Sequence, residues 1–219
     1  MIKGILLDVD GTIVLSNDAH ARAWVEAFAK YNYNIPFEKV RPLIGMGGDQ
    51  LIPTLIPELS AEEGIGKQIS DTRKEIFLSK YASTLQPAPG ARALIEKMMQ
   101  SGLKIIISSS SKKDELDVLL KAAGVGDLSI EATTSSEVEE SKPSPDIVAA
   151  ALEKIQLQPS EVLMLGDTPY DIKAARKCQV SVIAFRCGGF AEGQLKGAVA
   201  IYNDPQDLLD HYSESPLSQ

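Results

Sequence analysis

Four aspartates stand directly after two apolar runs of the chain: Asp8 and Asp10 after the first run, and Asp167 and Asp171 after a later one. If the fold brings them together, each close pair of carboxylates repels by on the order of 4 kcal/mol at an effective dielectric of about 20. They stay ionised only beside a cation. Because no histidine or cysteine stands near them, the ligands are oxygens alone, and Mg²⁺ is the favoured ion.

Hydroxyls and a lysine accompany these carboxylates. Thr12 follows the first two aspartates, four serines at 108–111 follow a second apolar run, and Lys142 stands in the segment Ser-Lys-Pro. Mg²⁺ and a lysine can offset the negative charge of a phosphoryl group, while hydroxyls and backbone N–H groups hold its oxygens. The residue types together indicate a site for a phosphoryl group.

The apolar runs that carry these residues are typical of parallel strands buried on both faces. From about residue 88 onward they alternate with amphipathic helical patterns, one of them with Ser144 as its N-cap and Pro145 in its first turn. This alternation predicts a doubly wound, mostly parallel α/β sheet, in which ligands bind at the carboxyl ends of the strands. The expected strands are 2–7, 103–107, 130–133, 162–165, 180–185 and 198–202.

Residues 16–85 break the alternation, because they contain two helical patterns and no convincing strand. The segment 60–63 is typical of a capping box that begins the second helix. A block of this length is too long for a loop, so we predict a helical cap at 16–85 inserted into an α/β core made of 1–15 and 86–219. The two buried faces expected in the cap are Ala21, Trp24, Val25 and Phe28 in the first helix and Ile65, Ile69, Thr72 and Ile76 in the second.

Four segments of the chain resemble the four motifs of the haloacid dehalogenase superfamily. They are Asp8-Val9-Asp10-Gly11-Thr12, Ser109 after an apolar run, Lys142 in SKPSPD, and Gly166-Asp167-Thr168-Pro169-Tyr170-Asp171. Their order and spacing match over nearly the whole chain. The inserted helices resemble the α-helical cap of the subfamily that includes phosphoglycolate phosphatases and β-phosphoglucomutases.

This resemblance implies a role for each acidic residue. Asp8 is expected to be the nucleophile that forms an aspartyl-phosphate. Asp10 is expected to protonate the leaving oxygen and later to deprotonate the attacking water. The resemblance also implies that Mg²⁺ is bound by the carboxylates of Asp8 and Asp167 and by the backbone carbonyl of Asp10, with Asp171 acting in the outer shell or through water.

The resemblance implies further roles for the polar residues. Ser109 and the N–H of Ser110 are expected to bind the phosphate, although the serine of 108–111 that does so is open by one position. Lys142 is expected to stabilise the charge on the nucleophile and the phosphoryl group, and Thr12 to brace the first loop. His20 stands where a histidine of relatives contacts the acid/base.

Three glycines fall within four positions of the cap, at Gly45, Gly47 and Gly48, and they predict a loop that approaches the ligand closely. We expect Gly45 and Gly47 to lie at the substrate. Phosphoglucomutase-like relatives carry basic residues in the matching loop, where this chain has Ile44 and Gly48 instead. Arg41 is close enough in sequence to compensate in part for a missing grip on a second phosphate.

We therefore predict a Mg²⁺-dependent phosphatase that hydrolyses a small phosphate monoester. The alternatives are a phosphomutase that shares Asp8 and Asp10, and a non-catalytic phospho-acceptor domain.

Composition limits the partners and the compartment. A net charge of −8 argues against binding to nucleic acid or to an anionic membrane surface, and no run approaches the roughly 20 apolar residues of a membrane span. The first residues lack the pattern of a signal peptide. Cys178 and Cys187 make no disulfide framework and are expected to be small buried hydrophobes. We expect a cytoplasmic enzyme acting on a small phosphorylated metabolite; the sequence leaves the oligomeric state open.

Overall fold

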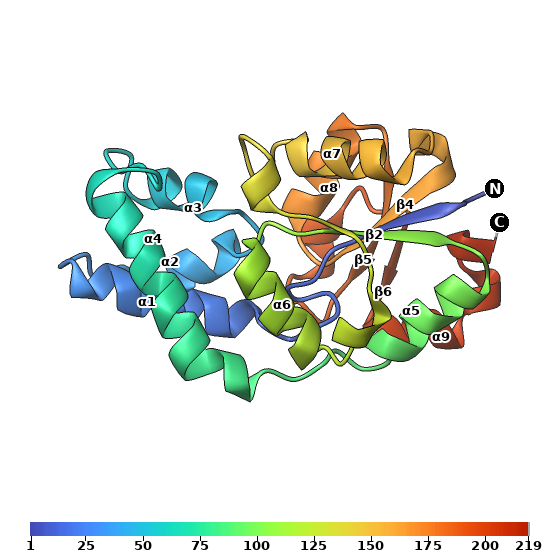
Figure 1. The fold of residues 1–219 in the computed structure, drawn as a ribbon, viewed down its shortest axis with the longest axis horizontal. Helices are drawn as coiled ribbons and strands as arrows, with labels where there is room; N and C mark the ends of the chain where they lie inside the picture. The colour runs from blue at the N-terminus through green and yellow to red at the C-terminus, as the bar shows by residue number, and fades with distance from the viewer. Residues whose placement is uncertain (219) are drawn as a thin grey trace.

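A parallel sheet of six strands forms the centre of the structure, a computed structural model that describes residues 1–218 (Figure 1). The strands are β1 (Gly4–Leu7), β2 (Lys104–Ser108), β3 (Ala132–Thr133), β4 (Val162–Gly166), β5 (Ser181–Phe185) and β6 (Ala200–Tyr202). Their order is β3-β2-β1-β4-β5-β6, and every pairing is parallel. The predicted doubly wound sheet is confirmed. The chain changes direction across the sheet beside β1, so the switch point at which such sheets bind ligands lies at the end of β1 and β4.

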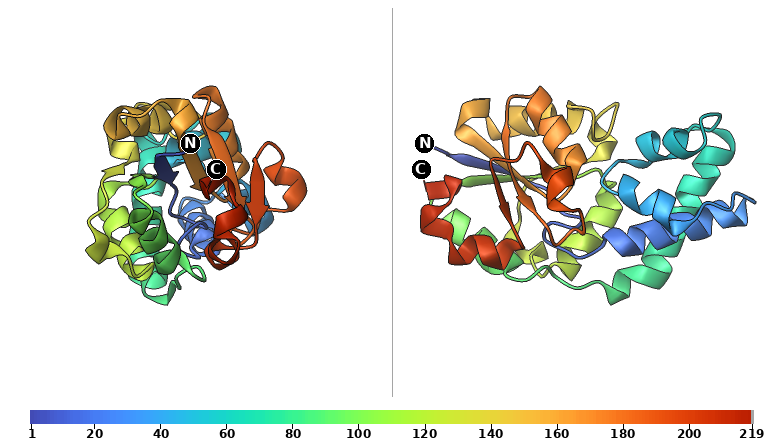
Figure 2. Two further views of the ribbon diagram at one scale, coloured as in Figure 1. Left: turned by 90° about the vertical axis from the view of Figure 1, so that its right-hand side faces the viewer. Right: turned by 180° about the vertical axis from the view of Figure 1, so that it is seen from behind.

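Helices cover both faces of this sheet (Figures 1 and 2). One face carries α5 (Ala91–Gln100), α6 (Lys113–Ala122) and α9 (Pro205–Asp210), and the other carries α7 (Asp146–Ile155) and α8 (Pro169–Lys177). Side chains alternate between the two faces of a strand. Ile5 and Leu7 of β1 therefore pack into one apolar core, while Leu6 packs into the other. This two-sided burial explains why β1 is apolar throughout.

Four further helices lie beyond the carboxyl edge of the sheet, at the opposite end of the molecule from the two termini (Figures 1 and 2). They are α1 (Asn17–Lys30), α2 (Phe37–Val40), α3 (Gly48–Leu55) and α4 (Gly64–Ile76), the last continued by a π-helical turn at Phe77–Tyr81. We call residues 16–85 the cap and the remainder the core. These boundaries stay a prediction from the sequence. Short 3₁₀ turns occupy Arg41–Leu43, Ala82–Thr84, Gly126–Leu128, Ser135–Glu137, Pro159–Glu161, Glu192–Leu195, Tyr212–Glu214 and Pro216–Ser218.

The two chain crossings between core and cap lie side by side. Val14 and Pro87 form an antiparallel bridge. The N–H of Leu15 donates to the carbonyl of Gln86 at 2.9 Å, and the N–H of Ala88 donates to the carbonyl of Ile13 at the same distance. The cap is therefore joined to the core through one narrow, hydrogen-bonded neck.

The capping box predicted at residues 60–63 is wrong. Helix α4 begins at Gly64, where the backbone is left-handed, so the helix does not extend back to Ser60. The Ser60 hydroxyl instead accepts a hydrogen bond from the N–H of Glu62 at 3.1 Å. Ile65 was expected on the buried face of this helix, but 46% of it is exposed. The buried residues of α4 are Gly66, Ile69 and Ile76.

The N-cap predicted at Ser144 is also wrong, by one position. Helix α7 begins at Asp146 with Pro145 preceding it, and the Ser144 hydroxyl donates to the Asp146 carboxylate at 2.9 Å. This side-chain bond competes with the cap that the serine could have provided.

Two remaining expectations concern the cysteines and the membrane. Cys178 and Cys187 are both free, and each is half-buried rather than fully buried. Within residues 1–218, no helix combines the length and the apolar character that a membrane crossing requires.

Candidate active site

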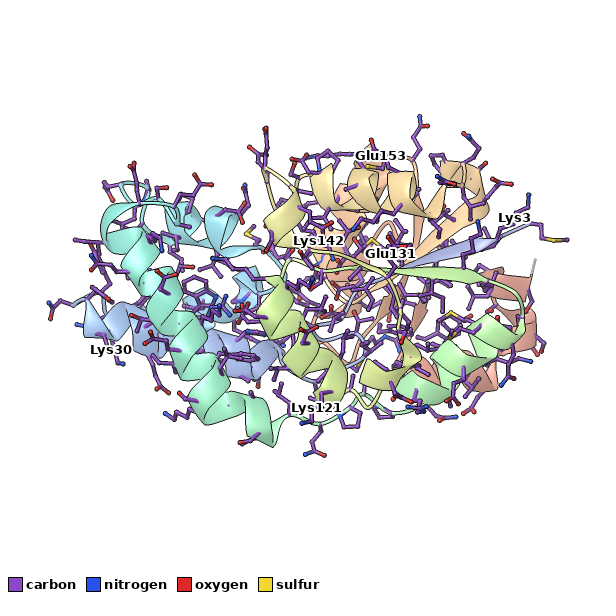
Figure 3. All side chains as sticks on the ribbon, in the orientation of Figure 1. Lys3, Lys30, Lys121, Glu131, Lys142 and Glu153 are labelled. Atoms are coloured by element: carbon purple, nitrogen blue, oxygen red, sulfur yellow. The ribbon has the colours of Figure 1, made fainter. Side chains whose placement is uncertain are left out.

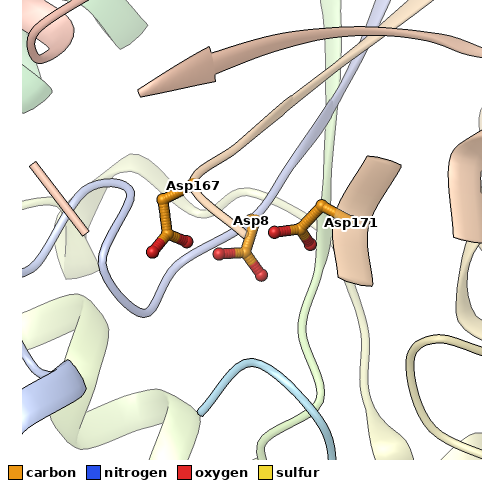
Figure 4. Close-up of side chains that lie close together, drawn as sticks. All are labelled: Asp8, Asp167 and Asp171. Atoms are coloured by element: carbon orange, nitrogen blue, oxygen red, sulfur yellow. The ribbon is translucent and has the colours of Figure 1, made fainter. Parts of the chain in front are cut away.

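Three buried aspartates meet at the carboxyl edge of the sheet (Figure 4). Asp8 follows β1, Asp167 follows β4, and Asp171 lies in the first turn of α8. One carboxylate oxygen of each lies within 4.8 Å of the others. The register of the sheet explains the convergence, because β1 and β4 pair in parallel and end beside each other. The structure thus brings together three of the four aspartates that follow the apolar runs of the sequence.

Lys142 reaches into this cluster from the segment that precedes α7. Its Nζ lies 2.6 Å from Asp8 Oδ1 and 2.7 Å from Asp171 Oδ1, and it donates to the carbonyl of Ser108 at 2.8 Å. The side chain is buried inside the molecule, whereas the other labelled lysines of Figure 3 lie at the outside. Although burial alone lowers the pKa of Lys142, the carboxylates of Asp171 and Asp8 raise it above its usual value. Lys142 is therefore a fixed positive charge.

Asp171 holds this lysine in place. Its Oδ1 faces Lys142, and its Oδ2 accepts hydrogen bonds from the N–H of Thr168 at 3.0 Å and from the Thr168 hydroxyl at 2.7 Å. The bond from the Thr168 N–H, together with the reciprocal bond that the Asp171 N–H donates to the Thr168 hydroxyl at 3.1 Å, forms the capping box that begins α8. Because both oxygens of Asp171 are engaged, the geometry favours a supporting position over direct contact with a metal ion.

The remaining charge of the cluster fits a hard cation. Burial, with help from the nearby Asp171 and Asp10, raises the pKa of Asp8 to about 7 even though Lys142 lowers it. Burial and the carboxylates of Asp8 and Asp171 raise the pKa of Asp167 well above its usual range. One ammonium does not neutralise three carboxylates. Oxygen donors with uncompensated negative charge are the environment that Mg²⁺ prefers.

Thr12 links the two carboxylates that are free to bind an ion. Its hydroxyl donates to Asp8 Oδ2 at 2.9 Å and lies 3.2 Å from Asp167 Oδ1. The residue is fully buried. The bracing role of Thr12 stays a prediction.

The side chain of Asp10 points away from the cluster and toward the cap. Its Oδ1 accepts from His20 Nε2 at 2.7 Å and from the Ser16 hydroxyl, and its Oδ2 accepts from the Ser111 hydroxyl at 2.9 Å. Burial would raise the pKa of Asp10, but the neighbouring His20 and the hydrogen bonds from His20, Ser16 and Ser111 lower it to about 2. Asp10 is therefore ionised, and two of its donors belong to the cap.

His20 is itself held by residues of the cap. Its ring stacks on Phe77 with centroids 3.9 Å apart, and its Nδ1 faces Arg73 Nη1 at 3.5 Å. The Arg73 guanidinium lies over the ring of Trp24 and forms an ion pair with Glu115 of α6. A cap arginine and a core glutamate thus meet beside the acid/base candidate.

Neither Arg73 nor Glu115 was predicted as a site residue, although the sequence carries a signal for Arg73. Arg73 stands four residues after Ile69 and three before Ile76, so it falls on the buried face of α4, where a cation is unusual. Glu115 has no comparable signal, because an acidic residue in the first turn of a helix is ordinary.

A pocket of about 50 Å³ opens over Asp8 and Asp10, between the core and the cap. Ser110 and Ser111 line it from the core; His20, Trp24, Arg73 and residues 44–48 line it from the cap. This volume holds only a few water molecules. A second, polar cavity of about 330 Å³ adjoins it and shares Gly48, Arg73 and Ser110 with it.

The glycine loop of the cap lies against the core. Gly45 has a φ of +108°, and a Cβ at this position would lie 2.6 Å from Thr168 Cγ2, so a side chain would push the loop off the core. Gly45 and Gly47 both line the pocket. Whether they contact a substrate stays a prediction.

The serines of the segment 108–111 have different surroundings. Ser109 is buried beneath the pocket, and its hydroxyl accepts from the N–H of Ser111 at 3.1 Å. Ser110 and Ser111 line the pocket instead, and the buried Ser110 hydroxyl has no hydrogen-bond partner within residues 1–218. The sequence analysis did not assign Ser111 a role.

Arg41 does not compensate for a missing grip on a second phosphate. Its Nε donates to Asp18 Oδ1 at 2.6 Å and its Nη2 donates to the carbonyl of Gly188, so the guanidinium faces a core loop. It is absent from the residues that line the pocket over Asp8.

Comparisons with known proteins agree with this geometry. The chain is 28% identical over 189 residues to Protein SUPPRESSOR OF QUENCHING 1, chloroplastic, of Arabidopsis thaliana; the match covers 84% of this chain and spans only 18% of that protein. It is 24% identical over 223 residues to a phosphoglycolate phosphatase of Rhodospirillum rubrum, covering 96% and 90% of the two chains. The crystal structure of a hydrolase from Pseudomonas syringae superposes with a TM-score of 0.90 at 30% identity, over 97% and 98% of the two chains.

A family model described as haloacid dehalogenase-like hydrolase matches residues 5–185. The matched region runs from β1 to the end of β5 and contains the aspartate cluster, Lys142 and the cap. The resemblance and the enzyme class predicted from the sequence are confirmed at this level. The strand-end aspartates, the sheet that positions them and the family match lead to one conclusion: this chain belongs to the haloacid dehalogenase-like hydrolases.

Proposed function

We propose that this hydrolase is a Mg²⁺-dependent phosphatase that cleaves a small phosphate monoester through an aspartyl-phosphate on Asp8. The observation that carries the proposal is the different environment of two aspartates beneath one pocket. Asp8 is paired with Lys142 and Thr12, whereas Asp10 is paired with His20, Ser16 and Ser111. Two carboxylates with distinct partners can take distinct roles, one as a nucleophile and one as an acid/base.

Asp8 carries out the first step in this proposal. A carboxylate oxygen attacks the phosphorus, a bond forms between them, and the bond from phosphorus to the leaving oxygen breaks. Lys142 lies 2.6 Å from Asp8 Oδ1 and offsets the negative charge at the nucleophile. The pKa of about 7 for Asp8 means that an added positive charge is needed for full ionisation at neutral pH.

Asp10 transfers the proton in this proposal. It protonates the leaving oxygen and then removes a proton from the water that attacks the aspartyl-phosphate. A pKa of about 2 makes Asp10 a base before substrate binds. The negative charge of a bound phosphoryl group raises the pKa of a neighbouring carboxyl, which allows Asp10 to hold the proton that it must donate.

Asp8 and Asp167 are the carboxylates that would hold the metal ion, together with the backbone carbonyl of Asp10. When bound, Mg²⁺ would offset charge on the phosphoryl oxygens. Thr12 would keep the two carboxylates in place through its contacts at 2.9 and 3.2 Å. Asp171 would act through Lys142.

The phosphoryl oxygens would lie against the serine loop. Ser110 and Ser111 face the pocket, and the unpartnered Ser110 hydroxyl can donate to a phosphoryl oxygen. Ser109 lies beneath and would support the loop through its bond with the N–H of Ser111. The phosphate-binding role of Ser109 stays a prediction that the Ser109→Ala and Ser110→Ala variants can separate.

The pocket favours a phosphatase over a phosphomutase of the β-phosphoglucomutase type. A mutase must also grip a second phosphate. Among the described residues that line the pocket over Asp8, the one arginine or lysine is Arg73, which is already paired with Glu115. The adjoining cavity adds Lys67, which is paired with Asp71, and Lys112. The similarity to a phosphoglycolate phosphatase supports a small phosphorylated metabolite as substrate. The phosphate-release screen identifies which metabolite is hydrolysed.

A phosphate-release screen tests the proposal. Purified protein with Mg²⁺ is assayed on sugar phosphates, phosphoglycolate, nucleotides and phosphorylated cofactors. Asp8→Asn is expected to abolish release while the melting curve and circular dichroism stay those of a folded protein. Asp117→Asn, an exposed aspartate of α6, is the matched control. No release from any substrate, or full activity of Asp8→Asn, would overturn the proposal.

The same assay separates the mutase alternative. A sugar phosphate that is isomerised faster than it is hydrolysed would favour transfer to a second hydroxyl. A phosphorylated Asp8 that persists for minutes without turnover would favour a phospho-acceptor domain.

A further inference from the structure

The first residue of α1, Asn17, bonds to the carboxylate proposed to bind metal. Its Nδ2 donates to Asp167 Oδ2 at 2.7 Å and to the carbonyl of Gly188 at 2.9 Å. Because both partners can only accept, the nitrogen of the amide must face them. Asn17 is 4% exposed, and none of the four motifs includes it. A cap residue therefore fixes one oxygen of a core carboxylate.

Gly188 closes the same side of Asp167. It lies in the loop after β5, and a Cβ at this position would stand 1.7 Å from Asp167 Oδ2. Only a glycine allows the backbone to lie against the carboxylate in this way. With the Thr12 hydroxyl 3.2 Å from Asp167 Oδ1, the two oxygens have separate partners. Asp167 is thus held in one orientation from two sides.

A second cap residue bonds to the same carbonyl. Arg41 Nη2 donates to the carbonyl of Gly188, its Nε donates to Asp18, and its guanidinium lies 5.6 Å from the centre of the Phe190 ring. Asn17 and Arg41 belong to the cap, whereas Gly188 and Phe190 belong to the core. These bonds therefore exist only while the cap contacts the core as it does here.

The other half of the Asn17 amide has no partner. Its Oδ1 is buried and makes no hydrogen bond within residues 1–218. It belongs to the same amide group as the Nδ2 that donates to Asp167 Oδ2. Mg²⁺ keeps several of its waters when it binds to proteins, and these waters need acceptors for their protons. The free Oδ1 is an acceptor of this kind.

From these contacts we propose that Asn17 is a positioning residue for Asp167 and that Arg41, through the carbonyl of Gly188, couples contact between cap and core to Mg²⁺ binding. The inference rests on the metal site of the proposed function. The partners that orient metal ligands typically contribute 10- to 100-fold to metal affinity. We call the arrangement in which Arg41 contacts Gly188 the closed cap. Since such coupling is reciprocal, bound Mg²⁺ raises the equilibrium constant for closing by the same factor as closing raises the affinity for Mg²⁺.

Calorimetric titration of MgCl₂ into the full chain, without substrate, tests the proposal. Asn17→Ala is expected to weaken Mg²⁺ binding by about 10-fold or more, and Arg41→Met by about 5-fold or more. Two controls are matched in residue type: Asn34→Ala, an exposed asparagine of the cap, and Arg22→Met, whose guanidinium lies over Phe37 within the cap. Both controls are expected to bind Mg²⁺ like the wild type.

Two further readouts separate positioning from a structural defect. In Asn17→Ala, the Mg²⁺ concentration for half-maximal activity should rise by the same factor as the dissociation constant, while kcat recovers at saturating Mg²⁺. A structural defect would lower kcat at every Mg²⁺ concentration. In hydrogen exchange, Mg²⁺ should slow the exchange of residues 41–48 in the wild type and not in Arg41→Met.

Each outcome decides the matter. If the wild type binds no Mg²⁺, the proposed function fails and this inference fails with it. If the wild type binds Mg²⁺ and releases phosphate while Asn17→Ala and Arg41→Met bind Mg²⁺ equally well, only this inference is overturned. If melting curves show that Asn17→Ala does not fold, the Mg²⁺ affinities of Asn17→Ser and Arg41→Met are compared with that of the wild type instead. Unchanged affinities in both would overturn this inference.

Discussion

Lys142 Nζ lies 2.7 Å from Asp171 Oδ1, and neither side chain is more than 1% exposed. A buried ion pair is tolerated only where further hydrogen bonds satisfy its remaining donors and acceptors. Lys142 has Asp8 and the carbonyl of Ser108, and Asp171 has the N–H and hydroxyl of Thr168. Through the contact of Lys142 with Asp8, the pair connects the end of β1 with the start of α8. It also fixes the positive charge of Lys142 next to the proposed nucleophile.

Replacement of this lysine tests its electrostatic role. Lys142→Met leaves buried carboxylates without a cation, so we expect a loss of about 3–5 kcal/mol in the free energy of unfolding without Mg²⁺. Added Mg²⁺ should recover part of the loss. Urea denaturation at pH 8 with and without Mg²⁺ measures both effects, and Lys121→Met, a lysine on the outside of α6 (Figure 3), is the control. An unchanged urea midpoint for Lys142→Met would contradict the prediction.

The raised pKa of Asp8 predicts how pH changes the effect of Mg²⁺. The unfolded chain binds this proton with a pKa of about 3.9, and the folded protein without metal binds it with a pKa of about 7. The stabilising contribution is therefore full below about pH 4 and is lost as pH rises through about 7. Because Mg²⁺ binds the ionised carboxylate, it must compete with this proton at low pH.

Melting curves recorded at pH 5 and pH 8 check this expectation. The rise in melting temperature caused by Mg²⁺ should be larger at pH 8 than at pH 5. Asp8→Asn has no proton to displace at this position. In this variant, the rise in melting temperature caused by Mg²⁺ should therefore differ less between pH 5 and pH 8 than in the wild type. An equal rise at both pH values in the wild type would show that Asp8 does not titrate in this range.

The acid/base role of Asp10 predicts a dependence on the leaving group. An alkyl phosphate releases a basic alkoxide that must be protonated, whereas p-nitrophenolate leaves without a proton. We expect Asp10→Asn to slow the first step, transfer of the phosphoryl group to Asp8, by about 10²- to 10⁴-fold for an alkyl phosphate and much less for p-nitrophenyl phosphate, as measured by rapid mixing. Hydrolysis of the aspartyl-phosphate should slow equally for both substrates, because the same intermediate forms from each. Asp8→Asn should abolish both reactions. In Asp10→Asn, equal losses on the two substrates in the rate of this first step would exclude the role of Asp10 as the general acid.

The ion pair between Arg73 and Glu115 predicts a strong thermodynamic coupling across the interface of cap and core. The Glu115 side chain is 1% exposed, so Arg73→Met leaves it buried and unpaired, at a cost of about 3–5 kcal/mol. The double variant Arg73→Met with Glu115→Gln should recover much of this loss. Urea denaturation of the four members of the cycle gives the coupling energy.

The neighbouring pair of Lys74 and Asp114 provides the control for that cycle. It also joins α4 to α6, but its side chains are 30% and 57% exposed. Lys74→Met should therefore change the stability by less than about 1 kcal/mol. A similar loss in Lys74→Met and Arg73→Met would show that burial does not distinguish the two pairs.

The residues that could be predicted from the sequence are those whose positions follow from local pattern. Asp8 and Asp167 stand at the ends of apolar runs, and parallel strands bring their ends together whatever the rest of the chain does. Lys142 needed the spacing of the family motifs, because nothing local separates it from a surface lysine. The fold class followed from the same alternation of runs and helices.

The residues that were missed owe their roles to contacts between distant segments. Asn17 and Gly188 are 171 positions apart and meet only in the folded protein. Arg41 was considered as a partial substitute for a missing grip on a second phosphate, but a core carbonyl and Asp18 are the partners of its guanidinium. The N-caps predicted at Ser60 and Ser144 failed for a local reason, since serine hydroxyls can bond to several nearby groups.

The paired neck at Val14 and Pro87 stands only a few positions after Asp10 and before Ser16 and His20. A swing of the cap about this neck would carry Ser16 and His20 away while the backbone of Asp10 stays with the sheet. An opened molecule would then lack two of the donors that keep Asp10 ionised. The same movement that lets the product leave would therefore also change the surroundings of Asp10, so a stiffer neck would be expected to slow product release.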